Sequence, residues 1–356
     1  MGKTSAGSLH LLFFLVAFLV GTSGVIGAGC SAQSGASETP VPTPDPRPQN
    51  YVFFGFDHEL ARDSTFLNGP FDGAQLRYFW RQLEPAKDQY DFAELQDLMD
   101  LLRAHNKGLF VQIQDVTFSE RIPAPNYLTD DPEYGGGVER KYERYGTGTP
   151  EFGGWVVRRW DPAVVGRLSR LLHALGSEFD GELTGINFAE TALDFEREDT
   201  LSPSGYSASS YADATIALMD SASHAFSTTV VIEYANFMPG EGKSTGRGFL
   251  RKVYAAADSL GVGVGGPDIL PFRPGQRAQS LPLIASRAET TQAGMAVQDG
   301  NLADIHPVTG ERATAEYVYQ FAADSLRLDY IFWGTEEPWF SEEVVPLVTS
   351  LKAHAH

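Results

Sequence analysis

The sequence is poor in cysteine, in positive charge and in long apolar runs. Its 356 residues include one cysteine, Cys30, so neither an intrachain disulfide framework nor a multi-cysteine metal cluster is possible. Lys and Arg total 27 against 46 Asp and Glu, and the formal net charge of −19 argues against nucleic acid as a partner because such a surface repels phosphate. No His-x-x-x-His spacing and no EF-hand-like loop occurs, so we predict no metal site, although a calcium ion held by acids stays an alternative.

The first thirty residues are typical of an export signal. Lys3 is the only charged residue before Cys30, and residues 9–20 form an apolar run. A membrane-spanning helix needs about 20 apolar residues, so the shorter run fits the core of a signal peptide. Gly27-Ala28-Gly29-Cys30 resembles the bacterial lipobox, which implies that residues 1–29 are removed and Cys30 is lipidated. Gly27 replaces the larger aliphatic residue usual there, so ordinary signal cleavage stays an alternative.

Residues 30–50 are a predicted linker. Proline stands at positions 40, 42, 44, 46 and 48, and alternating prolines favour an extended, semi-rigid spacer. An anchor followed by a spacer predicts an exported protein in the cell envelope, lipid-anchored to a bacterial membrane or otherwise periplasmic or secreted. Residues 51–356 are then the folded domain, and the sequence leaves its oligomeric state open.

From residue 51 onward, apolar runs alternate with segments of helical period, which is typical of a parallel α/β protein. The predicted strands are residues 51–56, 73–80, 108–115, 183–190, 228–235, 261–265, 294–298 and 329–333. Helices are predicted to start at Asp91, with Glu94 completing a capping box, and at Asp161 before Pro162. The further predicted helices lie near residues 207–226, 246–260, 277–290, 312–326 and 341–353.

The connection between the first two strands is short, so its helix is expected to be reduced or absent. Eight strands followed by helices predict a single (β/α)8 TIM barrel. An open doubly wound sheet is the alternative, but no Gly-rich dinucleotide or phosphate loop follows the first strand.

Most of the predicted strand ends carry a carboxylate, and two carry a tryptophan. The acids are Asp57, Glu59, Asp115, Glu190, Glu233, Asp268, Asp299, Glu336 and Glu337. In a barrel the loops after the strands meet at one mouth, so these side chains are expected to converge. Acids accept hydrogen bonds from hydroxyls and indole faces stack on sugars, so a mouth of this kind without basic residues is expected to bind a neutral polyhydroxylated ligand.

Three stretches resemble clan A glycoside hydrolases, the cellulase and β-galactosidase group. Trp80-Arg81-Gln82-Leu83-Glu84-Pro85, followed by Tyr90-Asp91-Phe92, resembles the W-x-x-x-E-P … Y-D-F stretch after their second strand. Residues 185–191 are similar to their fourth strand, which ends in the acid/base glutamate. Residues 330–333 are similar to their eighth strand, whose tryptophan forms the floor of a sugar subsite. The resemblance spans residues 51–353 in strand order and implies a glycosidase that needs no cofactor.

Glycoside cleavage requires one protonated and one ionised carboxyl group at the scissile bond. The resemblance implies that Glu190 is the proton donor. The sequence departs from the pattern because Ala189 replaces the usual Asn before this glutamate, and Asn187 is expected to face away. The seventh strand also ends in Asp299 in place of a nucleophilic glutamate. Asp299 is the candidate nucleophile or base, and Asp268, in a Gly-Gly-Pro-Asp turn, is the rival.

Eight further residues are candidate substrate contacts. They are Trp80, Gln114, Asp115, Asn236, Gln298, Asn301, Trp333 and Glu337. Trp333 is expected to be the sugar platform, with core packing as the alternative, while Glu84 is expected to structure its loop. Residues 116–160 show little period and are rich in aromatic residues, so we expect them to form one wall of an elongated saccharide cleft.

The sequence thus predicts a glycoside hydrolase acting on an oligo- or polysaccharide, with water as second substrate. A non-catalytic carbohydrate-binding lipoprotein with the same fold is the alternative, motivated by the two departures. A lyase or isomerase on the same barrel is a third possibility, which predicts an unsaturated or rearranged product.

Overall fold

A computed structural model describes residues 48–143, 151–193, 195, 203–241 and 246–354. The predicted signal peptide, Cys30 and all of the predicted linker before residue 48 lie outside the described residues. Within the described ranges, no helix combines the length and the apolar character that crossing a membrane requires.

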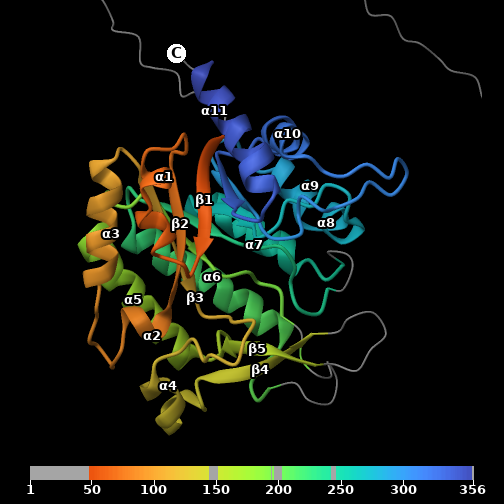
Figure 1. Cartoon of the computed structure of the whole chain (residues 1–356). Coiled ribbons are helices and arrows are strands. Elements are labelled where there is room, and N and C mark those ends of the chain that lie inside the picture. The colour runs from red at the N-terminus through yellow and green to blue at the C-terminus, as the bar shows by residue number, and fades with distance from the viewer. Residues whose placement is uncertain (1–47, 144–150, 194, 196–202, 242–245, 355–356) are drawn as a thin grey trace, which may run out of the picture. The chain divides into compact units, whose positions relative to one another are not determined.

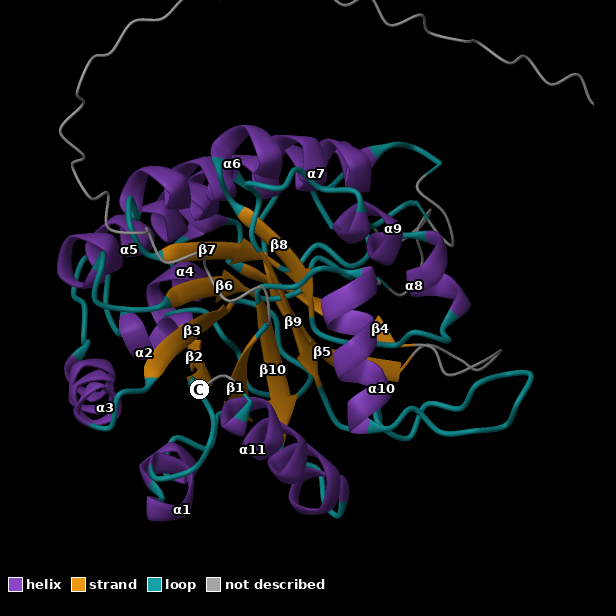
Figure 2. Cartoon of the chain, turned by 90° about the horizontal axis from the view of Figure 1, so that it is seen from above, coloured by secondary structure: helices purple, strands orange, loops and turns teal. Residues whose placement is uncertain are grey.

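Eight parallel strands close into a barrel in the order β1-β2-β3-β6-β7-β8-β9-β10 (Figures 1 and 2). Their bounds are Gln49–Gly55 (β1), Gly73–Phe79 (β2), Gly108–Gln114 (β3), Gly185–Phe188 (β6), Val230–Glu233 (β7), Gly263–Gly266 (β8), Ala293–Val297 (β9) and Tyr330–Gly334 (β10). All eight predicted strands are present, and the closed barrel excludes the open sheet. The first strand begins within the predicted linker, because Gln49 pairs with Tyr330 to close the barrel.

Helices surround the barrel (Figure 2). Their bounds are Ser64–Leu67 (α1), Trp80–Leu83 (α2), Ala93–Ala104 (α3), Asn126–Asp130 (α4), Pro162–Phe179 (α5), Ala208–Ala225 (α6), Phe249–Leu260 (α7), Pro274–Ala278 (α8), Ser280–Ala285 (α9), Ala315–Gln320 (α10) and Val345–Ala353 (α11). Between β1 and β2 the chain forms only a 3-10 turn, Leu60–Arg62, and the four-residue α1, so the prediction of a reduced first helix is confirmed.

The two predicted helix starts differ in outcome. Asp161 caps α5 by accepting a hydrogen bond from the Ala163 amide at 2.9 Å. The capping box predicted at the start of α3 is wrong, because the Glu94 carboxylate lies 2.8 Å from Nδ1 of His58 in place of reaching back to the helix N-terminus. A tertiary side-chain contact thus replaces the local hydrogen bond of the capping box.

The barrel interior is filled by side chains from alternate strand positions. The rings of Tyr51, Phe110 and Tyr330 meet edge to face, although β1 and β3 are not neighbours in the sheet. Above them, the Gln75 amide donates hydrogen bonds to Asn187 Oδ1 and to the Tyr234 hydroxyl, each at 2.9 Å. This buried polar layer closes the barrel below its mouth, so a ligand can enter only from the C-terminal side of the strands.

The segment after β3 contains more regular structure than its sequence predicts. It includes α4 and an antiparallel hairpin of β4 (Val138–Glu143) and β5 (Glu151–Val157). Figure 1 shows this hairpin at the end of the barrel toward which the β1 arrow points, which is the mouth. A two-stranded ribbon outside the main sheet has little periodicity to detect, since only part of each strand is buried.

Candidate active site

Glu190 lies just past β6 and is half-buried at the mouth. Its carboxylate accepts a hydrogen bond of 2.6 Å from the side-chain amide of Asn236, which follows β7 and is buried. Burial raises the pKa of Glu190, the Asn236 hydrogen bond opposes this effect, and the negative charge of Asp268 raises the pKa further. A raised pKa favours the protonated form, which is the form that a general acid requires.

Asp268 lies just past β8 and is held in the same manner. Its Oδ1 accepts a hydrogen bond of 2.9 Å from the amide of Asn301. The side-chain Oδ1 of Asn301 in turn accepts hydrogen bonds from the backbone amides of Ile269 and Gln298, both at 3.2 Å. These bonds fix the orientation of the Asn301 side-chain amide. Burial raises the pKa of Asp268, whereas Asn301 and the charges of Arg77 and Arg273 lower it.

Arg77 brings a positive charge to the mouth, which corrects the expectation of a site without basic residues. It shares the inward face of β2 with Gln75, and its Nε donates to Gln112 Oε1 at 2.7 Å. Burial lowers the pKa of Arg77, and the charges of Glu190 and Asp268 act in the opposite direction. The sequence could have indicated Arg77, because it follows the inward-facing Gln75 by two positions and residues two apart in a strand share a face.

A second cation comes from the hairpin. Lys141 of β4 is 4% exposed, and its ammonium lies 3.8 Å from the ring centre of Phe118. Its charge lowers the pKa of Glu190, so the hairpin contributes to the electrostatic surroundings of the candidate acid. Nothing in the local sequence marks this lysine, because its position depends on how the hairpin folds back over the mouth.

Asp299 lies apart from this pair. It is exposed in a turn between Gln298 and Asn301, where Gly300 has a φ of 83° and donates its amide to Glu336 Oε2 at 2.7 Å. The acid whose charge raises the pKa of Glu190 is Asp268. Asp268, the rival candidate, is therefore favoured over Asp299 as the partner of Glu190. Gln298 lies at the rim and is half-buried.

Neither predicted tryptophan lines the mouth. Trp333 is 0% exposed and donates its indole N–H to Asn50 Oδ1 at 2.9 Å, within the layer between barrel and helices. Trp80 is also fully buried and donates to Glu84 Oε2 at 2.7 Å. The expected sugar platform at Trp333 and the expected substrate contact at Trp80 are both corrected, and core packing, the alternative for Trp333, is what the structure shows. Along β10 it is Phe332 that points into the barrel, so the next residue points outward.

Two predicted ligand contacts are otherwise engaged. Asp115 is 1% exposed and forms a buried bidentate ion pair with Arg159 on the outer side of β3, so its predicted contact with substrate is corrected. Glu337 is exposed and accepts hydrogen bonds from the hydroxyl and amide of Ser341, at 2.6 and 3.3 Å. Gln114, a third predicted contact, is also buried, and its side chain lies beside that of Gln112.

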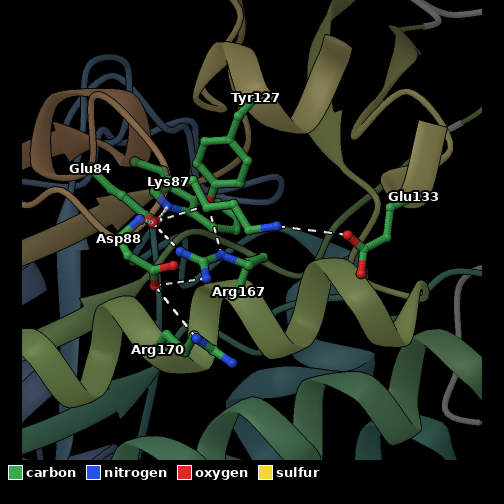
Figure 3. A network of polar contacts seen from close by, with 8 residues as sticks. Glu84, Lys87, Asp88, Tyr127, Glu133, Arg167 and Arg170 are labelled. Atoms are coloured by element: carbon green, nitrogen blue, oxygen red, sulfur yellow. Dashed lines mark hydrogen bonds and ion pairs between the residues drawn. The ribbon is translucent and has the colours of Figure 1, made fainter. Parts of the chain in front are cut away.

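The expectation for Glu84 agrees with its surroundings (Figure 3). Its carboxylate is fully buried, pairs with Arg167 of α5 and accepts from the Tyr127 hydroxyl at 3.0 Å. Arg167 also binds Asp88 at 2.9 Å. This network joins the loop after β2, the start of the hairpin segment and α5, and it thereby supports one wall of the mouth. Among the described residues, no three His, Cys, Asp or Glu side chains are grouped as a metal ion would require.

Two solved glycoside hydrolases share this architecture. The catalytic domain of β-amylase from Paenibacillus polymyxa aligns with a TM-score of 0.56, over 86% of this chain and 98% of its own, at 8% identity. The β-galactosidase from the psychrophilic Marinomonas ef1 aligns with a TM-score of 0.52, over 86% of this chain and 60% of its own, at 9% identity. No protein-family profile and no curated protein matches the sequence.

The chain thus has the barrel fold of glycoside hydrolases, and the resemblance inferred from its strand motifs is confirmed at the level of the fold. Because one barrel supports many reactions, function must be argued from the residues of the mouth.

Proposed function

We propose that the protein is a glycoside hydrolase that cleaves an oligo- or polysaccharide with a pair of carboxyl groups. The observation that carries this proposal is the pair Glu190 and Asp268, two acids from strand ends, each oriented by an asparagine amide. Such a pair, one protonated and one ionised, is what glycoside cleavage requires.

The charges around the pair assign the two roles. Asp268 faces both Arg77 and Arg273, which stabilise its ionised form. Burial and the negative charge of Asp268 favour the protonated form of Glu190, against the opposing effects of the Asn236 hydrogen bond and of the charges of Lys141 and Arg77. Glu190 therefore donates the proton to the leaving oxygen, and Asp268 acts as nucleophile or as base toward water. A carboxyl separation of about 5–5.5 Å predicts retention of configuration and one of about 6.5–9.5 Å predicts inversion.

The proposal departs from the sequence-based pairing with Asp299. Two motif departures motivated a binding-only protein. We propose that Asn236, which binds Glu190, and Asp268 compensate for the missing asparagine and glutamate. A lyase or isomerase has no specific observation in its favour among the described residues.

The test is reducing-sugar release from a polysaccharide panel by the wild type and by Glu190→Gln, Asp268→Asn and Asp299→Asn. We expect the first two substitutions to reduce kcat by at least about 100-fold, the scale of acid–base catalysis, and the third to leave it within about twofold. If Glu190→Gln and Asp268→Asn keep wild-type rates, the assignment is wrong. If the wild type binds a glycan and releases no sugar, the binding-only alternative holds.

We further propose that the domain acts outside the cytoplasm on a carbohydrate partner, lipid-anchored through Cys30 after removal of residues 1–29. The support is the lipobox-like sequence alone. Radiolabelled palmitate should enter the wild type and not Cys30→Ser, and equal labelling of both would refute the anchor.

A further inference from the structure

The aromatic surface at the mouth is made by phenylalanines that the sequence motifs do not mark. Phe56, just past β1, is 42% exposed, and its ring stacks on that of Phe79 at the end of β2, with centroids 4.2 Å apart and planes at 23°. The preceding Gly55 has a φ of 60°, a conformation that favours glycine and turns the chain back over β2. One face of the Phe56 ring is covered by Phe79, so its exposed area belongs to the other face and the rim.

This ring is connected to the candidate catalytic acids through β2. Phe79 is two residues past Arg77 and shares its face of the strand, and Arg77 acts electrostatically on both Glu190 and Asp268. The Arg77 guanidinium also lies 4.6 Å from the ring centre of Phe53, an inward-facing residue of β1. In the closed barrel β1 lies across from β7 (Figure 2). Phe56 therefore stands on the opposite rim of the mouth from the two acids.

We infer that Phe56 is a sugar-stacking platform, on which a pyranose ring of the substrate lies face to face, across the mouth from the bond that is cleaved. Its ligand is a saccharide unit that presents a flat C–H face, the surface that an aromatic ring binds. The inference rests on the proposed function, because it assigns a subsite to the same mouth. It replaces the two buried tryptophans with an aromatic residue that a ligand can reach.

Phe56 differs from another exposed apolar residue in the same β1–β2 connection in ways that allow a matched control. Leu60 is also 42% exposed, but it has no flat ring. If exposed apolar area alone mattered, both positions would contribute equally to binding. If stacking matters, only Phe56 contributes.

The experiment uses the full-length protein with cellohexaose, mannohexaose, xylohexaose and laminarihexaose. KM and kcat are measured for any hexaose that is hydrolysed, and Kd is measured by calorimetry for any that is only bound. The variants are Phe56→Ala, Phe56→Leu, Phe56→Trp and Leu60→Ala, each checked by circular dichroism for folding. Phe56→Leu retains an apolar cover over Phe79 while it removes the flat face, so its effect is not attributable to unfolding.

We expect Phe56→Ala and Phe56→Leu to raise KM or Kd about tenfold, near the upper end of one stacking contact, with kcat nearly unchanged. Phe56→Trp and Leu60→Ala should bind as the wild type does. Wild-type binding by Phe56→Leu would overturn the platform and leave the hydrolase proposal intact. Binding that depends on Phe56 without hydrolysis would support the platform and refute the hydrolase proposal. If none of the four hexaoses is bound or cleaved, the platform is overturned, and the hydrolase proposal is decided by sugar release from the polysaccharide panel.

Discussion

Glu233 is predicted to make the stability of this protein fall as pH rises from 5 to 8. The residue ends β7 with its side chain directed away from the barrel interior, where it is 2% exposed beside the Arg159–Asp115 ion pair. Its Oε1 has no hydrogen-bond partner among the described residues. Burial raises the pKa of Glu233 to about 8, an effect that the positive charge of Arg159 only partly offsets.

The sign and size of the effect follow from this pKa. An unfolded glutamate ionises near pH 4.5, whereas Glu233 in the fold ionises near 8. Between these values the folded state holds one proton more, so its free energy of unfolding decreases as pH rises. At about 1.36 kcal/mol per pH unit, the whole interval corresponds to about 5 kcal/mol. Glu233→Gln keeps the shape and removes the titration, so the variant lacks this decrease.

The assay is urea unfolding followed by circular dichroism at pH 5, 6, 7 and 8 for the wild type and Glu233→Gln. Other groups titrate in both proteins, so the difference between the two free energies isolates Glu233. The variant should gain about 3–4 kcal/mol over the wild type between pH 5 and 8, because part of the total of about 5 kcal/mol falls below pH 5 and part above pH 8. A difference that stays constant within about 1 kcal/mol over this range would refute the reasoning, because Glu233 would then ionise in the fold as it does in the unfolded chain.

Three further predictions concern the mouth and its supporting wall. Asn236→Ala removes a hydrogen bond that lowers the pKa of Glu190, so the alkaline limb of the pH profile of kcat should shift to higher pH. An unchanged alkaline limb would mean that Glu190 and Asn236 take no part in catalysis. Arg77→Gln removes a positive charge that favours the ionised form of Asp268. The variant should therefore have a reduced kcat/KM, and the acidic limb of its pH profile should shift to higher pH. Arg77→Lys should partly restore both. Arg167→Met leaves the buried Glu84 carboxylate without an ion-pair partner, so urea unfolding should show a loss of about 3–5 kcal/mol in the free energy of unfolding. A loss below about 1 kcal/mol would mean that the network of Figure 3 contributes little.

Local patterns in the sequence were sufficient for the barrel. Each strand is a short apolar run between helical periods, and each such signal lies within one element, so no knowledge of the closed fold is needed to detect it. The position of Glu190 after the fourth barrel strand follows for the same reason, since the end of a strand is a local feature. The Gly-Gly-Pro sequence before Asp268 likewise indicated a turn that could direct this acid toward the mouth.

Tertiary structure alone decided which side chains meet. Period-two alternation places neighbouring residues on opposite faces of a strand, but closure of the barrel determines which face becomes the interior. That choice directs Arg77 into the mouth and Trp333 into the helix layer. The bond between Asn236 and Glu190 joins two strand ends that are 46 residues apart in the sequence. Partners at that separation are brought together by packing of the whole barrel, which no local pattern encodes.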